Sequence, residues 1–241
     1  MLEAIIFDLY LTLIDLSKAK PEYLHRAAWR TLRNLGHSLD YGRFVETVEK
    51  VYQKWRKYRV ENLVEVNQRL WWFEILRKME IRANPHIVEE IVQERHRVFG
   101  ERITLYDDVE DALKLLKKQN RHLVIVSNSS DGFFARDDIK HLGLDQYIDL
   151  IVMSGDLDSR KPDPKIFRHT LNILDVRPNQ SVIVGDDLEA DIRGAKNVGM
   201  YSIYLNRYNE KRDSDIRPDA QISNLSQLQE ALSDIEKREE K

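Results

Sequence analysis

The chain has 241 residues, of which 42% are hydrophobic and 33% charged, which is typical of a soluble globular protein with one large domain or a core domain and a smaller companion. Its formal net charge of -3 argues against nucleic acid as the main partner, because proteins that bind the phosphate backbone usually carry a basic excess. The absence of cysteine excludes disulfides, thiolate nucleophiles and cysteine-ligated metals, so a metal site must use oxygen or imidazole ligands.

Hydropathy also excludes two classes of protein. No run approaches the roughly 18 apolar residues of a membrane span, and the start of the chain lacks the basic segment of a signal peptide. We therefore expect a cytoplasmic protein without a membrane partner. The sequence leaves a monomer and a homodimer open.

The first element is an apolar run, Ala4 to Phe7, which reads as a buried strand and is followed at once by Asp8. An ionised carboxylate in such a place costs several kcal/mol unless it is paired, bound to a metal or at the end of the strand. Asp8 is therefore a candidate for chemistry. The alternative is a plain strand-end or helix-capping residue.

The next 84 residues, 16–99, show helical periodicity without a convincing strand. Apolar residues recur there at three- and four-residue spacing in four successive segments. Gly36 and Asn84-Pro85 are typical helix boundaries. The segments are KPEYLHRAAWRTLRNLG, GRFVETVEKVYQKWRKYRV, VNQRLWWFEILRKM and HIVEEIVQERHRVF. We expect a small four-helix cap domain inserted after the first strand.

The remainder of the chain alternates apolar strand-like runs with helical segments. This alternation predicts an α/β fold in which a parallel sheet is covered by crossover helices. We assign residues 1–15 and 100–241 to this core domain. The further strands are expected at Leu123 to Val126, Ile148 to Met153, Ser181 to Val184 and Tyr201 to Leu205.

Polar residues follow several of these strands. Ser127 and Asn128 close one strand, Asp186 and Asp187 close another, and Lys161 lies in a loop after a third. Because ligands collect outside the carboxyl ends of parallel strands, we expect these side chains to meet Asp8 at one edge of the sheet. Taken singly, each has an ordinary interpretation as a turn, a solvated loop lysine or a helix N-terminal charge.

Four motifs occur in one order along the chain: IIFDLYLTL, VIVSNSS, RKPDPKIF and VIVGDDLEADIRGAKNVGM. In these motifs and in the helical insertion after the first of them, the chain resembles the haloacid dehalogenase superfamily of hydrolases over nearly its whole length. The resemblance implies a Rossmann-like core, a four-helix cap and catalysis through an aspartyl ester.

The resemblance also implies roles for individual residues. Asp8 would be the nucleophile, Thr12 and Ser127 would hydrogen-bond it or the oxygens of the transferred group, and the backbone N–H of Asn128 would be a further donor. Lys161 would balance the negative charge that nucleophile and substrate bring together. The metal ligands implied for Mg²⁺ are Asp8, the backbone carbonyl of Tyr10, Asp186, Asp187 and Asp191, an all-oxygen set suited to this hard cation.

Two departures from the family pattern leave alternatives open. Family phosphatases usually carry a second Asp two residues after the nucleophile, whereas this chain has Tyr10, as the family's 2-haloacid dehalogenases do. Tyr10 can donate a proton but is a poor base near neutral pH, and it can also be a packing residue beneath the cap. Leu11 stands where the family normally has Gly, and its side chain should stiffen the turn or crowd the entrance.

Electrostatics favours one enzyme class over the other. Dehalogenases of the family need no metal, and an anionic haloacid would be repelled by Asp186, Asp187 and Asp191 in the absence of a cation. With Mg²⁺ these acids favour phosphate monoester hydrolysis. We therefore predict an Mg²⁺-dependent phosphatase of small phosphorylated metabolites such as triose or sugar phosphates. A metal-independent 2-haloacid dehalogenase and a catalytically weak binding protein are the alternatives.

The cap offers candidates for substrate recognition. Its aromatic residues either line a substrate pocket or form the core of the cap. Arg56 is the candidate for binding a substrate anion, and its alternative is an exposed, solvated arginine. The aromatic residues are Trp55, Tyr58, Trp71, Trp72 and Phe73.

Overall fold

The computed structural model describes residues 1–210 and 214–239. The chain forms two compact units, one of residues Met1–Asp15 and Thr104–Lys241 and one of residues Leu16–Ile103. The second boundary therefore lies a few residues beyond the position 99 expected from sequence. The reason is that the last helix of the second unit continues to Gly100 and the buried Ile103 stays with it.

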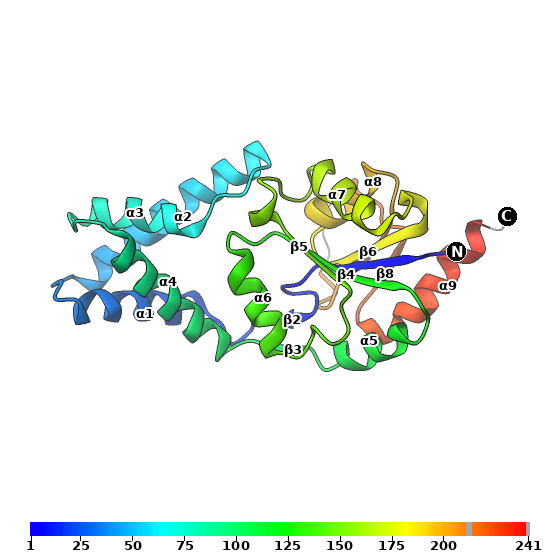
Figure 1. Cartoon of the computed structure of the whole chain (residues 1–241), viewed down its shortest axis with the longest axis horizontal. Helices are drawn as coiled ribbons and strands as arrows, with labels where there is room; N and C mark the ends of the chain where they lie inside the picture. Colours follow the sequence, from blue (N-terminus) through cyan, green and yellow to red (C-terminus); the bar gives the residue numbers. More distant parts are fainter. Residues whose placement is uncertain (211–213, 240–241) are drawn as a thin grey trace. The chain divides into compact units, whose positions relative to one another are not determined.

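The first unit is an α/β fold built on a parallel six-stranded sheet, as predicted, and is shown in Figure 1. The strand order is β5-β4-β1-β6-β7-β8, and each neighbouring pair is parallel. The strands are β1 (Ala4–Phe7), β4 (His122–Ser127), β5 (Leu150–Met153), β6 (Ser181–Gly185), β7 (Tyr201–Leu205) and β8 (Ala220–Ile222).

The short strand β1 lies in the middle of the sheet because all four of its side chains are apolar and completely buried. It pairs with β4 on one side and β6 on the other, so that Phe7 is level with both Ile125 and Val184. This register brings the carboxyl ends of the three strands to one edge. Residue 8 therefore lies beside the residues that follow β4 and β6.

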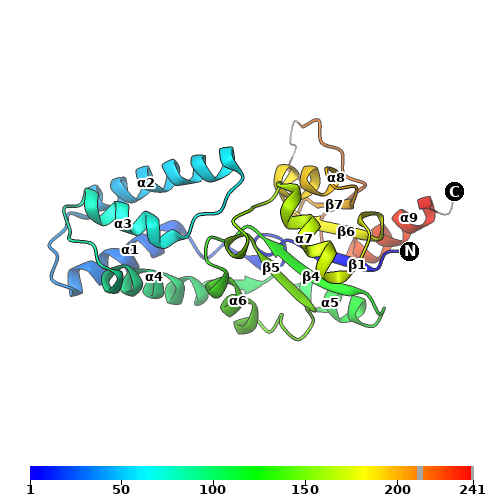
Figure 2. The same ribbon diagram turned by 45° about the horizontal axis from the view of Figure 1, so that its top comes forward.

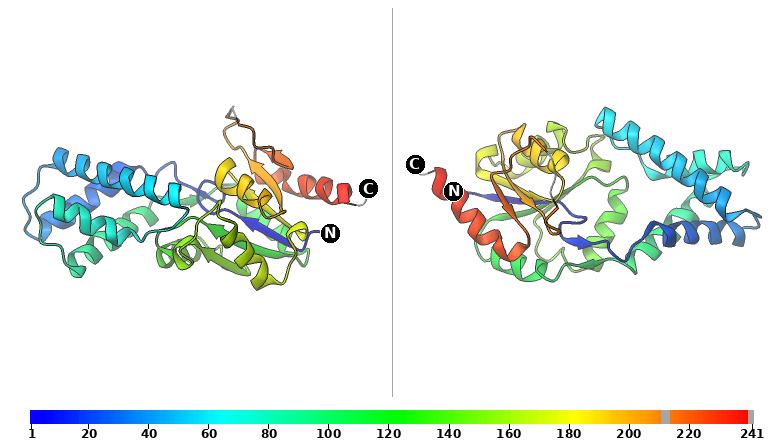
Figure 3. Two further views of the ribbon diagram at one scale, coloured as in Figure 1. Left: turned by 90° about the horizontal axis from the view of Figure 1, so that it is seen from above. Right: turned by 180° about the vertical axis from the view of Figure 1, so that it is seen from behind.

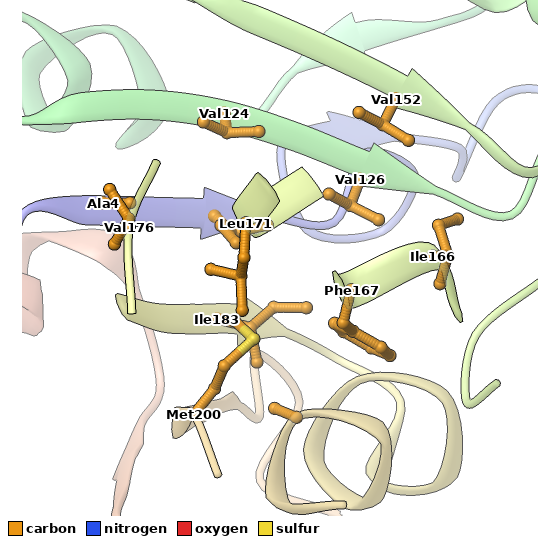
Figure 4. Close-up of a cluster of buried hydrophobic side chains, with 12 residues drawn as sticks. Ala4, Val124, Val126, Val152, Ile166, Phe167, Leu171, Val176, Ile183 and Met200 are labelled. Atoms are coloured by element: carbon orange, nitrogen blue, oxygen red, sulfur yellow. The ribbon is translucent and has the colours of Figure 1, made fainter. Parts of the chain in front are cut away.

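Helices cover both faces of the sheet, with α7 and α8 on one side and α5 and α9 on the other in Figure 1. Figure 4 shows how α7 places Phe167 and Leu171 against Val126 and Ile183. Burying a side chain as large as that of Phe167 contributes about 1.5–3 kcal/mol. The core helices are α5 (Val109–Lys117), α6 (Gly132–His141), α7 (Pro164–Leu174), α8 (Gly194–Lys196) and α9 (Leu228–Glu239).

One strand is shifted from the sequence prediction and three short strands were not predicted. β5 begins at Leu150 rather than Ile148, and β8 was not predicted, because its three residues include a glutamine and leave no readable pattern. The loop after β1 also returns as β2 (Ile14–Asp15), which pairs antiparallel with β3 (Thr104–Leu105). Strands of two residues carry too little periodicity to be recognised from sequence.

The second unit consists of four helices, as the periodicity predicted. α1 packs along α4 and α2 along α3, an arrangement visible in Figures 2 and 3. Asn84 caps α4 by accepting a hydrogen bond from the N–H of Ile87 at 3.0 Å, and Pro85 occupies the first turn. The helices are α1 (Pro21–Asn34), α2 (Tyr41–Asn62), α3 (Gln68–Lys78) and α4 (Pro85–Gly100).

None of the helices within the described ranges combines the length and the apolar composition that crossing a membrane requires.

Candidate active site

Asp8 leaves the sheet directly after β1, where its N–H still donates to the carbonyl of Val184 at 3.0 Å. Its side chain is buried, and its Oδ1 accepts a hydrogen bond of 2.6 Å from Nζ of Lys161. The same ammonium group donates to Oδ1 of Asp191 at 2.6 Å and to the carbonyl of Val126 at 2.7 Å. All three protons of Lys161 therefore have acceptors.

The loop that carries Lys161 is fixed by Asn128 at the end of β4. Asn128 Oδ1 accepts from the backbone N–H of Lys161 at 2.8 Å, and its Nδ2 donates to the carbonyl of Lys161 at 3.0 Å. The sequence analysis considered only the backbone N–H of Asn128 as a donor to substrate. The geometry adds a second task for its side chain, which is to hold the backbone of Lys161 in place.

Three carboxylates surround Lys161. One oxygen of each of Asp8, Asp186 and Asp191 lies within 4.8 Å of the others. Oδ1 of Asp186 accepts a 3.1 Å hydrogen bond from the Thr12 hydroxyl. The two oxygens of Asp191 accept from Lys161 and from the backbone N–H of Asp187. Asp8 and Asp186 thus fit a divalent cation best, since carboxylate oxygens are the ligands that Mg²⁺ prefers.

The side chain of Asp187 caps a helical segment and does not join this cluster of carboxylates. Its Oδ1 accepts from the N–H groups of Glu189 and Ala190 at 2.9 and 3.0 Å, so it caps the π-helical segment Leu188–Arg193. The clustered carboxylates do not include it. That Asp187 binds the metal stays a prediction, and the geometry gives its carboxylate another role as a helix cap.

Gly185 makes room for this arrangement. A Cβ atom at this position would lie 2.2 Å from Oδ2 of Asp191. Only glycine therefore permits the Asp191 carboxylate to approach the end of β6 so closely. The glycine and the π-helical segment together place Asp191 behind Lys161.

The excess of negative charge shows in the pKa values. Burial raises the pKa of Asp186 to about 6 and that of Asp191 to about 8, and in both cases the charge of Asp8 adds to the effect. Burial alone would lower the pKa of Lys161, but Asp191 and Asp8 outweigh it and the pKa lies above its ordinary value. One ammonium group faces three acids, which is the environment that a bound cation would relieve.

The turn after Asp8 contains the residue that departs from the family pattern. Leu11 has φ of 66°, in the left-handed region that favours glycine, and its N–H donates to the carbonyl of Ile14 at 2.8 Å. The Leu11 side chain is 41% exposed. The turn thus keeps the conformation for which glycine is suited, at a steric cost of about 1–3 kcal/mol.

The Tyr10 hydroxyl donates to Oδ2 of Asp138 at 2.7 Å. Asp138 is a buried residue of α6 that the sequence analysis did not identify. Burial and the charge of Asp138 hold the pKa of Tyr10 well above its ordinary value. Because its proton is directed at Asp138, Tyr10 does not offer that proton to a leaving group in this arrangement.

Arg207, after β7, is a second residue that sequence analysis missed. Its Nη2 donates to the carbonyl of Thr12 at 2.8 Å, and its guanidinium forms an ion pair with Asp108. It therefore supports the loop from which Thr12 reaches Asp186. The rule that polar residues follow the carboxyl ends of strands could have identified it, since Arg207 lies two residues beyond Leu205, the last residue of β7.

Two predicted substrate contacts occupy different environments. Ser127 is the buried last residue of β4, and its hydroxyl has no hydrogen-bond partner among the described residues. Arg56 is an exposed residue of α2, and among residues 1–210 and 214–239 it forms neither an ion pair nor a hydrogen bond. Both residues stay predicted substrate contacts.

Comparisons with known proteins identify the family of the chain. The profile of the haloacid dehalogenase-like hydrolases matches residues 2–199. The chain is 29% identical to a glyceraldehyde 3-phosphate phosphatase of Pyrococcus furiosus, over 96% of this chain and 93% of the relative.

Two solved structures share the fold over nearly their whole length. A HAD phosphatase from Thermococcus onnurineus has a TM-score of 0.67 at 26% identity, with 96% of this chain and 98% of the other covered. A 2-haloacid dehalogenase from Pseudomonas syringae pv. Tomato has a TM-score of 0.70 at 27% identity, with 97% and 99% covered. The family predicted from the four motifs is thus confirmed, and this chain belongs to the haloacid dehalogenase-like hydrolases.

Proposed function

We propose that the protein is an Mg²⁺-dependent phosphatase that hydrolyses small phosphorylated metabolites through an aspartyl-phosphate intermediate on Asp8. It is a phosphoric monoester hydrolase, in keeping with the full-length phosphatase relative and the phosphatase structure. The relative named for glyceraldehyde 3-phosphate supports a triose phosphate or a related sugar phosphate as substrate.

The proposal rests on the excess of acidic groups over basic groups around Lys161. Three buried or half-buried carboxylates, those of Asp8, Asp186 and Asp191, surround one ammonium group. A further anion would be repelled there by several kcal/mol in a partly desolvated site without another cation. A divalent cation would offset the excess and would act as a Lewis acid on a phosphoryl oxygen.

The side chains of the site supply the nucleophile and stabilise the phosphoryl group. Asp8 uses a carboxylate oxygen to attack phosphorus, so that an acyl-phosphate bond forms as the bond from phosphorus to the substrate oxygen breaks, and the leaving alkoxide takes its proton from solvent. Lys161 stabilises the charge that accumulates on the phosphoryl oxygens, while Ser127 donates its hydroxyl proton to one of them. Water then attacks the phosphorus of the intermediate, which releases phosphate and regenerates the Asp8 carboxylate.

A metal-independent 2-haloacid dehalogenase is the second candidate, because Tyr10 matches that class and a dehalogenase has the same fold. An assay of purified protein against phosphomonoesters and 2-haloacids, with Mg²⁺ and with EDTA, distinguishes the two. We expect phosphate release that requires Mg²⁺. Halide release in EDTA would replace the proposal by the dehalogenase, and absence of both activities would indicate a binding protein.

A further inference from the structure

The helical unit contains two arginines that stack on neighbouring tryptophans. Cζ of Arg59 lies 4.4 Å from the ring centroid of Trp71, and Cζ of Arg95 lies 5.1 Å from that of Trp72. Such cation–π contacts hold a guanidinium group in place but accept none of its hydrogen bonds. The two pairs therefore differ only in what else surrounds the arginine.

Arg59 has its counterion within the same unit. Its Nη1 donates to Oε1 of Glu65 at 2.9 Å, and both residues are buried. Nε of Arg59 lacks an acceptor among the described residues, but the charge of the guanidinium is compensated. This is the usual condition for a buried arginine.

Arg95 has no such partner. Its Nε and Nη1 are buried, and within residues 1–210 and 214–239 they have no hydrogen-bond acceptor. The carboxylate of Glu49 interacts electrostatically with Arg95, but it pairs with Nε2 of His25 at 3.2 Å. Burial lowers the pKa of Arg95 to about 10, against the opposing effects of Tyr52 and Glu49. The group still carries its positive charge at neutral pH.

A cation whose buried N–H donors lack acceptors is costly in free energy, and an anion that accepts from those donors removes the cost. Four buried side-chain atoms of the helical unit lack a hydrogen-bond partner among the described residues, and all four are N–H donors: Nε of Arg59, Nε1 of Trp71, and Nε and Nη1 of Arg95. We propose that Arg95 is an anion-binding site of the helical unit, in which the guanidinium group held over the ring of Trp72 donates to a carboxylate or phosphate group.

The anion binds the helical unit independently of turnover, so a measurement of binding that needs no catalytic activity tests the proposal.

The experiment measures anion binding to the protein in the absence of turnover. Thermal unfolding in EDTA is followed with increasing malonate or inorganic phosphate for wild type, Arg95→Gln and Arg95→Met. Met keeps an apolar stem beside Trp72, which guards against a variant that does not fold. Arg97→Gln is the matched control, because Arg97 lies on the same helix but is exposed and paired with Glu94 and Glu101.

We expect saturating anion to raise the Tm of wild type and of Arg97→Gln by roughly 5 °C and to shift the Arg95 variants much less. Equal shifts in wild type and in both Arg95 variants would overturn the proposal, since the anion would then bind elsewhere. This measurement stands even if the protein shows no phosphatase activity.

Discussion

Lys161 in the α/β unit is buried, Arg95 in the helical unit is half-buried with its Nε and Nη1 enclosed, and the surroundings of the two groups are opposite. Lys161 donates to two carboxylates and one carbonyl, so every proton of its ammonium group is used. Arg95 rests on Trp72, and among the described residues it has no acceptor for Nε or Nη1. The first cation belongs to a preorganised site. The second is incomplete until an anion arrives.

The difference matters for function because the two sites respond differently to substitution. In the α/β unit, each charged residue compensates another, so removal of one exposes its partner. In the helical unit, removal of Arg95 takes away an electrostatic attraction to Glu49 but no hydrogen bond of its carboxylate, which still lies 3.2 Å from Nε2 of His25. Loss of stability should therefore accompany loss of function in the α/β unit. In the helical unit, a variant of Arg95 should lose anion binding without a loss of stability.

The largest effect is expected for Asp8→Asn. The amide keeps the size of the side chain but cannot attack phosphorus, so kcat should fall by at least about 10³-fold. Asp191 and Val126 still accept from Lys161, so the fold should persist. Steady-state kinetics and circular dichroism measure the two properties. Activity within tenfold of wild type would rule out the aspartyl-ester mechanism.

Stability tests the comparison directly. Lys161→Met leaves Asp8 and Asp191 without their shared cation and should lower the free energy of unfolding by about 3–5 kcal/mol in the absence of metal. Arg59→Met should act similarly through Glu65. Arg95→Met should leave the free energy of unfolding unchanged or higher. Urea unfolding in EDTA measures the free energy of unfolding of the three variants. If Arg95→Met lowers it as much as Arg59→Met does, Arg95 is not distinguished from a paired buried arginine.

The fold and the site differ in how far the sequence predicted them. The apolar runs predicted five of the six strands of the parallel sheet, helical periodicity predicted the four helices of the second unit, and strand order predicted that Asp8 and Lys161 lie at one edge. Asp138 and Arg207 were missed because neither stands in one of the four motifs, and their contacts with Tyr10 and Thr12 form only in the folded chain. Arg95 has no motif, since its distinguishing property is a partner that it lacks.

The role of Asp187 illustrates a second limit of sequence reasoning. Adjacent acids after β6 have the same appearance in sequence, but within residues 1–210 and 214–239 it is Asp186 and the more distant Asp191 that cluster with Asp8. Asp187 instead caps the segment that follows it. Which of two neighbouring carboxylates faces the sheet edge depends on the local backbone conformation, and the sequence pattern does not specify it.

Asp186→Ala should produce an intermediate effect. Asp186 is proposed as a direct ligand of the metal, so its loss should weaken apparent Mg²⁺ affinity by about 10–100-fold while leaving Asp8 and Lys161 in contact. Excess Mg²⁺ should partly restore the rate. Titration of activity with Mg²⁺ measures this, with Asp187→Ala as the control that should change the affinity less. An unchanged titration curve for Asp186→Ala would exclude it as a ligand.

Tyr10→Phe should cost about 1–3 kcal/mol of stability, because it removes a donor from the buried carboxylate of Asp138. Addition of Asp138→Asn should recover part of the loss, since an uncharged amide is cheaper to leave without that donor. Urea unfolding of the two single variants and the double variant completes a double-mutant cycle. Strictly additive effects would show that the observed hydrogen bond contributes nothing.

The smallest effect concerns His25, which reports on the charge of Arg95 without any catalytic assay. Burial lowers the pKa of His25, Arg95 lowers it further, and Glu49 opposes them. Arg95→Gln removes one of the two lowering influences, so the pKa of His25 should rise. An anion bound at Arg95 should shift it in the same direction in wild type, because the anion screens the guanidinium charge. NMR titration of the imidazole resonance, assigned with His25→Gln, measures both shifts. If malonate moves the pKa of His25 equally in wild type and in Arg95→Gln, the anion acts on the imidazole without Arg95, and the contrast between the two cations loses its functional meaning.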